Sequence, residues 1–101
     1  MIKISTGSTK TAEEFIYDNI NKLGEIKSIQ HKRNGKSADF QTIISGEYYE
    51  MIIDGGITSG YSGTGPNGFI RVLKKLGLDE ETAENLVKGN RDEEHSFIYN
   101  F

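Results

Sequence analysis

Residues 48–54, Tyr-Tyr-Glu-Met-Ile-Ile-Asp, are followed by a glycine-rich segment at 55–68 and then by Phe-Ile-Arg-Val-Leu-Lys-Lys-Leu at 69–76. Aromatic and β-branched residues dominate the first part, which predicts a mostly buried strand. Apolar residues recur at helical spacing in the last part, which predicts a helix that ends at Gly77. Six of the 12 glycines and the single proline lie in the segment between them. A strand-to-helix connection of unusual composition therefore occupies the middle of the chain.

Two further strands are predicted immediately before this one. Residues 25–33 form a weak strand, and residues 37–45 form the strand that returns alongside it. Asn34-Gly35 between them predicts a two-residue type I′ hairpin turn, because both positions tolerate positive φ. Together with residues 48–54, these strands predict an antiparallel meander.

The N-terminal residues predict one more strand and a first helix. Residues 1–5 alternate weakly and form a short strand. Thr11 and Glu14 fit a capping box, with Thr11 as the N-cap of a helix over residues 12–23. The hydroxyl-rich turn at residues 5–10 is interpreted as capping of this helix, with a phosphate-facing edge as the alternative.

The C-terminal residues complete the predicted fold. Asp79 begins a third helix that ends at Gly89. Residues 93–101 alternate with period two and predict a closing strand with one aromatic face. The resulting order, β-α-β-β-β-α-α-β, predicts an α+β domain spanning residues 1–101. We expect a mainly antiparallel sheet of four or five strands with two or three helices packed on one face.

Composition narrows the classes of function. The chain has 101 residues, no cysteine and a formal net charge of −3. The negative charge argues against binding to nucleic-acid polymers or membranes, and the lack of cysteine excludes disulfides and thiol catalysis. No apolar run approaches the roughly 20 residues of a membrane span, and the N-terminus reads as a strand rather than a targeting signal. We expect a cytoplasmic protein without a cofactor or a metal site.

The segment at residues 60–68 is the strongest candidate for a binding site. Glycines let a ligand approach the backbone closely, and free amides at a helix start attract phosphate. Pro66 suits the first helical position, after Thr64 or Gly65 as N-cap. The segment matches neither the P-loop nor the dinucleotide-binding fingerprint, so a simple capped connection is the alternative. The candidate ligand-binding residues here are Gly60, Tyr61 (which offers a stacking face), Ser62, Gly63, Thr64, Gly65 and Asn67.

Two arginines outside the segment are also candidates. Arg71 lies one turn into the following helix, close enough to help bind an anion at its start. Arg91 precedes the last strand and is either a phosphate clamp or the partner of a neighbouring carboxylate. Lys32, Arg33 and Lys36 flank the predicted hairpin turn, and we expect them to form a small, solvated positive tip.

Catalytic residues are not evident. His31 and His95 are the two histidines, and they fall on different predicted strands without motif-like neighbours. Adjacent glutamates on one helix do not face each other, so no acid/base pair is predicted. We therefore predict a protein that is not an enzyme.

The run Gly60-Tyr61-Ser62-Gly63-Thr64-Gly65-Pro66, followed by an aliphatic helix, resembles a pattern in small phage and bacterial proteins of uncharacterised function. Some phage proteins of similar size are nucleotide-sequestering sponges, such as the Thoeris anti-defence proteins. The resemblance covers about a dozen residues. It implies a homo-oligomer that sequesters a cyclic-nucleotide signal without cleaving it, near subunit contacts. The net negative charge departs from a basic sponge.

Three hypotheses follow from the sequence. The first is a non-enzymatic protein that binds a phosphate-bearing nucleotide through the glycine-rich loop. The second is a protein–protein interaction module, such as an inhibitor of a host enzyme or an antitoxin-like partner, because the aromatic last strand can pair with another chain. The third is a small hydrolase that uses His31 or His95.

Overall fold

A five-stranded sheet organises the computed structural model, which describes all of residues 1–101. Its strands are β1 (Ile2–Ser5), β2 (Ile26–Asn34), β3 (Asp39–Gly46), β4 (Glu50–Asp54) and β5 (Glu94–Asn100). Their order across the sheet is β1-β4-β3-β2-β5; β1 is parallel to β4, and all other neighbouring strands are antiparallel. The predicted α+β class, the element order and the meander are confirmed.

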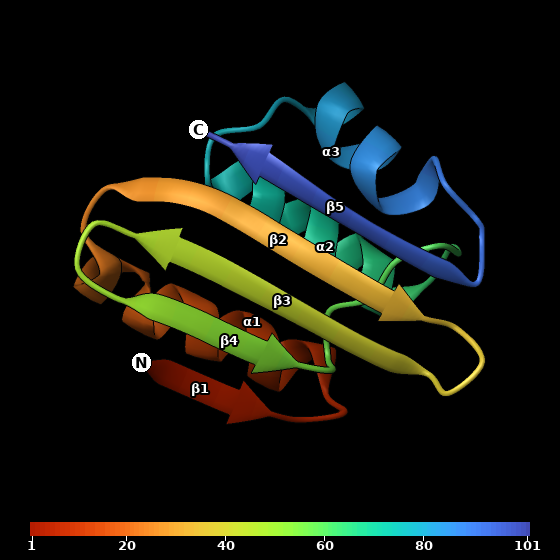
Figure 1. Cartoon of the computed structure of the whole chain (residues 1–101), viewed down its shortest axis with the longest axis horizontal. Coiled ribbons are helices and arrows are strands. Elements are labelled where there is room, and N and C mark those ends of the chain that lie inside the picture. Colours follow the sequence, from red (N-terminus) through yellow and green to blue (C-terminus); the bar gives the residue numbers. More distant parts are fainter.

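Helices cover one face of this sheet. They are α1 (Thr9–Asn19, continued by a 3₁₀ turn at Ile20–Leu23), α2 (Thr64–Lys75) and α3 (Glu80–Lys88). Figure 1 shows α1 and α2 behind the strands and α3 beyond the outer edge of β5. α3 packs against α2. The opposite face of the sheet carries no helix.

The core lies between the sheet and the two covering helices. Alternate residues of the strands point toward the helices, so Ile29, Ile44 and Ile53 are fully buried. Phe69 and Leu73 of α2 are fully buried against them. Burial of such a side chain contributes about 1.5–3 kcal/mol, so these residues fix the position of α2 and of the glycine-rich segment before it.

β4 is shorter than the sequence predicts. The expected strand begins at Tyr48, but β4 begins at Glu50. The backbone N–H of Tyr48 donates to the carbonyl oxygen of Leu23 at 2.9 Å, which holds this residue in the turn before the strand. Tyr48 and Tyr49 are therefore exposed, by 70% and 53%.

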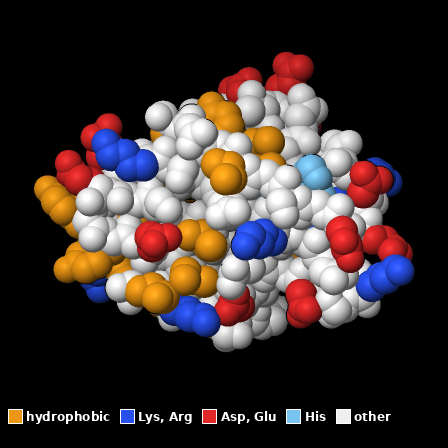
Figure 2. Space-filling view, in the orientation of Figure 1, with side chains coloured by type: hydrophobic (Ala, Val, Ile, Leu, Met, Phe, Trp, Pro, Cys, Tyr) orange, Lys and Arg blue, Asp and Glu red, His pale blue; other side chains and the backbone are white.

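Figure 2 shows apolar side chains on the helix-free face of the sheet, scattered among polar ones.

The predicted two-residue turn at Asn34-Gly35 is wrong. The connection between β2 and β3 spans residues 35–38, with Ala38 at φ +56°. The Oδ1 atom of Asn34 accepts the backbone N–H groups of Lys36 and Ser37, at 3.2 and 3.4 Å. These side-chain bonds stabilise a wider turn than the type I′ geometry allows.

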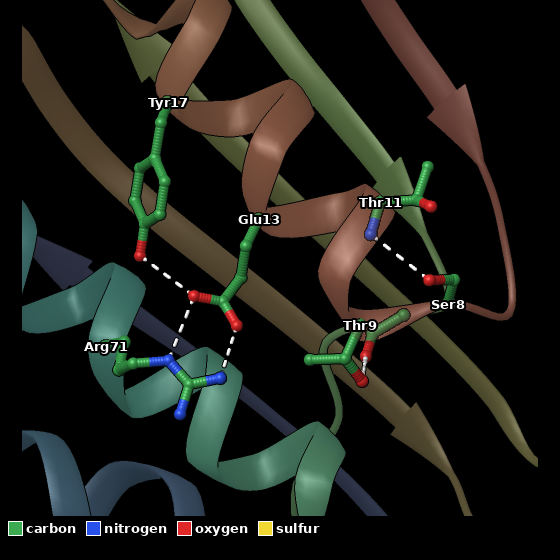
Figure 3. A network of polar contacts seen from close by, with 7 residues as sticks. Ser8, Thr9, Thr11, Glu13, Tyr17 and Arg71 are labelled. Carbon is green, nitrogen blue, oxygen red and sulfur yellow. Dashed lines mark hydrogen bonds and ion pairs between the residues drawn. The ribbon is translucent and has the colours of Figure 1, made fainter.

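The predicted helix starts are partly wrong. Ser8, and not Thr11, is the N-cap of α1, and its Oγ accepts the N–H of Thr11 at 3.1 Å (Figure 3). α2 starts at Thr64, so its N-cap is Gly63 rather than Thr64 or Gly65, and Pro66 is its third residue rather than its first. Asp79 occupies the N-cap position of α3, as predicted, but its side chain makes no capping hydrogen bond.

Candidate functional site

A buried chain of polar side chains fastens the glycine-rich segment to the sheet. Ser59 belongs to that segment, and its Oγ lies 2.8 Å from Nε2 of His31 on β2. The other ring nitrogen, Nδ1, lies 2.9 Å from Oγ1 of Thr42 on β3. All three residues are almost completely buried. Because each polar atom has a partner, the chain holds the segment in place without leaving a polar group unsatisfied.

His31 is neutral in this setting. Burial above all, then the charge of Arg33 and then His95, lower its pKa from the usual 6.5 to about 3. Nη1 of Arg33 donates to Ser59 Oγ at 3.0 Å. We therefore assign the Ser59 hydroxyl proton to the bond with Nε2, and the imidazole proton to Nδ1, which donates to Thr42.

Arg33 is the most unusual charged residue of the fold. The sequence places it in a solvated hairpin tip, but it is only 6% exposed, because it shares the helix-facing side of β2 with Ile29 and His31. Nε donates to the carbonyl oxygen of Asp92 at 3.0 Å, and Nη2 donates to that of Asn90 at 3.1 Å. None of the six ion pairs in the structure includes Arg33.

The electrostatic consequence is a buried cation without a carboxylate counter-ion. Burial lowers the pKa of the Arg33 guanidinium, and the nearby Asp92 raises it. An arginine stays protonated in either case. Neutral carbonyl oxygens solvate the charge but do not cancel it, so the guanidinium itself attracts anions. The chambers also contain carboxylates, those of Asp39, Asp54, Asp92 and Glu93, which confine this attraction to the immediate surroundings of Arg33.

Two cavities meet at this arginine. The large chamber, of about 770 Å³, is formed at one end of the sheet by residues 5–7, 32–34, 38–41, 54–56 and Thr58. The small chamber, of about 380 Å³, is lined by Ser59, Gly60, Tyr61, Gly35 and residues 91–93. Both chambers are also lined by Arg33, Ala38 and Phe40. They are therefore neighbouring parts of one groove.

Contacts across the groove fix its walls. The hydroxyl of Tyr61, in the small chamber, lies 2.6 Å from Oγ1 of Thr58, in the large chamber. Gly60 has φ +88°, and a Cβ there would lie 2.6 Å from Nη1 of Arg33. A Cβ on Gly65 would lie 2.0 Å from Thr58 Oγ1. Glycine at these two positions is thus required for packing of the segment on the groove.

Three of the nine predicted ligand-binding residues share a cavity. Gly60, Tyr61 and Arg91 line the small chamber. Thr64 and Arg71 line a separate cavity of about 330 Å³ between α1 and α2. The other four predicted residues line neither chamber: Ser62 and Asn67 are exposed, Gly63 is half-buried and Gly65 is buried.

Arg71 pairs with a neighbouring helix instead of facing the start of α2. Its Nε donates to Oε2 of Glu13 at 3.0 Å, and Nη2 donates to Oε1 (Figure 3). The Tyr17 hydroxyl donates to the same Oε2 at 3.1 Å. Burial and the Glu13 carboxylate raise the pKa of Tyr17 to about 12. This network ties α1 to α2. Of the two predicted ligand-binding residues that line this cavity, Arg71 is therefore already paired, and Thr64 is the other.

Comparison with protein-family models, curated proteins and solved structures finds no match to this chain. None of the three α-helices combines the length and the apolar character that crossing a bilayer requires. The structure holds no cluster of three or more acidic or histidine side chains suited to a metal ion.

Proposed function

We propose that this domain binds a small phosphate-bearing nucleotide in the groove around Arg33 and holds it without chemical change. The observation that carries the proposal is the buried guanidinium of Arg33, which forms no ion pair and lines both chambers. The hydrogen bonds that Arg33 donates to the carbonyl oxygens of Asn90 and Asp92 offset the cost of burying its charge. A phosphate nearby gains Coulomb energy, and the gain is larger the less water lies between the two charges.

The size and lining of the groove fit this class of ligand. Both chambers fall within the ~300–1,000 Å³ range of small-molecule sites. Phe40 and Tyr61 supply aromatic faces in the small chamber. Asp39, Gln41 and Asp54 supply acceptors for amino groups in the large chamber. The lining thus favours a ligand that has an anionic group near Arg33 and hydrogen-bond donors at its other end.

The setting of His31 supports binding rather than catalysis. Both ring nitrogens of His31 already have partners, and a pKa of about 3 leaves the ring uncharged at neutral pH. His31 is also fully buried, so it does not reach a ligand in the groove. Sequestration of an immune signal during phage anti-defence, and assembly into a homo-oligomer, remain predictions from the resemblance.

A thermal-shift screen against mono-, di- and cyclic nucleotides tests the proposal. A nucleotide at 100 times its Kd adds about 2.7 kcal/mol, which for a domain of this size raises Tm by more than ~10 °C. Arg91→Glu reverses an exposed charge in the small chamber and should weaken binding at least ~10-fold. Lys75→Glu makes the same charge change on α2, outside both chambers, and should bind normally.

Two results would contradict the proposal. A screen without a shift for any nucleotide would remove the ligand class. Equal losses of affinity in Arg91→Glu and Lys75→Glu would mean that the ligand binds outside the groove, or that the loss comes from the change in net charge that both variants share. Mass analysis of the ligand released on denaturation separates the remaining alternatives, because an altered ligand would make the protein an enzyme.

A further inference from the structure

β5 leaves a full row of backbone groups without a strand partner. It forms one edge of the sheet and pairs with β2 alone. The N–H of Phe101 donates to the carbonyl oxygen of Lys27 at 2.9 Å. In an antiparallel ladder the direction of these groups alternates, so odd-numbered residues face β2. The N–H and C=O groups of Glu94, Ser96, Ile98 and Asn100 therefore point outward from the edge.

This edge lacks the usual features that prevent strand addition. Residues 95–101 contain no lysine, arginine or proline, and the pairing with β2 runs without a bulge. By contrast, β1 at the opposite edge has four residues and carries Lys3. Charged residues, prolines, bulges and short length are the common protections of an edge. β5 is long, regular and open.

Apolar side chains of β5 remain partly exposed on both faces of the strand. α3 packs against α2, and Figure 1 shows it beyond the outer edge of β5. Phe97 and Tyr99, on the helix-facing side, are half-buried, and Ile98, on the helix-free side, is 59% exposed. An added strand would bury these side chains further and gain free energy from the apolar area removed from water.

The charge around the edge indicates the chemistry of the partner. α3 exposes Glu80, Glu81 and Glu84, and Glu93 and Glu94 lie at the start of β5. The structure gives no ion pair to Glu81, Glu84 or Glu94. Figure 2 shows acidic side chains at the margin where Figure 1 places α3. This field attracts lysine and arginine and repels carboxylates.

The same charges disfavour a second copy of this chain. Antiparallel pairing of β5 with itself would place the two α3 helices over one seam, because each lies just beyond its own β5 (Figure 1). Each helix would bring the same three exposed glutamates. Like charges brought together in this way cost free energy, whereas a segment without a helix layer meets no such obstacle.

We propose that β5 accepts an extended, basic segment of another protein as a sixth strand. The segment runs antiparallel to β5, with apolar side chains beside Phe97 and Tyr99, a lysine or arginine beside Glu94, and further lysines or arginines at its ends, where the chain leaves the edge near Glu93 and α3. Main-chain hydrogen bonds to residues 94–100 supply affinity, and the charges supply selectivity. This interaction does not depend on the nucleotide groove.

Amide hydrogen exchange measured by NMR tests the proposal directly. The probe is a capped seven-residue peptide with alternating valine and lysine. In the protein alone, the outward amides of Ser96, Ile98 and Asn100 should exchange fast, and those of Phe97 and Tyr99 should exchange slowly. With peptide at ten times its Kd, the outward amides should slow roughly tenfold, because exchange then requires release.

Matched peptides and variants separate strand addition from general attraction. A peptide N-methylated at the residues that face β5 keeps the charge but cannot pair, and should give no protection. Ile98→Lys places a like charge at the edge and should weaken binding by about fivefold. Ser45→Lys adds the same charge on the helix-free face of β3 and should bind as the wild type does.

Three outcomes would overturn the proposal. The first is absence of protection at millimolar peptide. The second is equal protection by a peptide with glutamate in place of lysine. The third is a wild-type protein of twice the 11.3 kDa chain mass whose outward amides are protected without peptide, because a second copy would then occupy the edge.

Discussion

His31 should make the fold sensitive to acid well above the pH at which carboxylates titrate. The unfolded chain binds a proton at this residue with the usual pKa near 6.5, whereas the native pKa is about 3. Between these values the unfolded state binds more protons, so the free energy of unfolding falls as pH falls. The stabilisation is complete above pH ~6.5 and is lost progressively toward pH ~3.

The magnitude follows from the two pKa values. Each pH unit below the unfolded pKa costs about 1.4 kcal/mol. The expected loss from this residue alone is about 2 kcal/mol at pH 5 and about 3.3 kcal/mol at pH 4. Against a typical total of about 5–15 kcal/mol, this is a large share of the stability of a small domain.

Urea unfolding followed by circular dichroism at about pH 7.5 and pH 5 measures the effect. His31→Gln keeps a donor and an acceptor for Ser59 and Thr42 but does not titrate, so it should lose about 2 kcal/mol less than the wild type between the two pH values. His95→Gln controls for the other histidine; it removes only the smallest cause of the His31 shift and should retain most of the wild-type response. Equal losses in the wild type and His31→Gln would refute the assignment of His31 as a buried neutral residue.

Three further predictions concern backbone strain and the α1–α2 network. Gly60→Ala should lower the free energy of unfolding by about 2–3 kcal/mol, because the residue lies at φ +88° and a Cβ meets a guanidinium at 2.6 Å; Gly7→Ala, with open space around its Cα, should change it by less than ~0.5 kcal/mol in urea unfolding. Ala38→Gly should raise the free energy of unfolding by about 0.5–1 kcal/mol, and with it the melting temperature, because Ala38 lies at φ +56°. A destabilised variant would contradict this. Glu13→Gln should move the pKa of Tyr17 from about 12 part of the way toward 10 in an NMR titration, because the carboxylate is the second cause of the shift after burial; an unchanged pKa would mean that burial alone sets it.

The element order could be predicted because its signals are local. Period-two alternation marks β5, helical spacing marks α2, and Asp79 and Gly89 mark the ends of α3. Each of these signals survives folding because tertiary packing uses the same apolar residues that create the pattern. The strand-to-helix order of an α+β domain then follows from the chain alone.

The misplaced boundaries share one cause, which is competition between backbone patterns and individual hydrogen bonds. Asn34 bonds two backbone N–H groups and widens its turn. Ser8 caps α1 one turn earlier than the capping box at Thr11. Tyr48 bonds Leu23, a residue distant in sequence, and leaves the strand. The residue propensities and the capping-box and turn motifs in the sequence do not specify which of these hydrogen bonds forms, so they do not fix the boundaries.

The candidate site depends on Arg33, which the sequence pattern predicts to lie in a solvated hairpin tip. Lys32 and Lys36 beside it are exposed, and charge alone does not distinguish the three residues. One signal was present: Arg33 follows Ile29 and His31 at period two, so strand alternation places it on their side of the sheet. Its acceptors, Asn90 and Asp92, lie nearly 60 residues further along the chain, and no local pattern predicts that contact.

The glycines that suggest a ligand site also have a packing role, whether or not they touch a ligand. Gly60 and Gly65 bring the segment close to Arg33 and Thr58, and a side chain at either position would push the segment off the groove. Loss of binding in a glycine variant would therefore report a displaced wall as readily as a lost ligand contact. Exposed residues of the chambers, such as Arg91, are the informative targets, because their substitution changes the charge of the groove and leaves the packing around Ser59 intact.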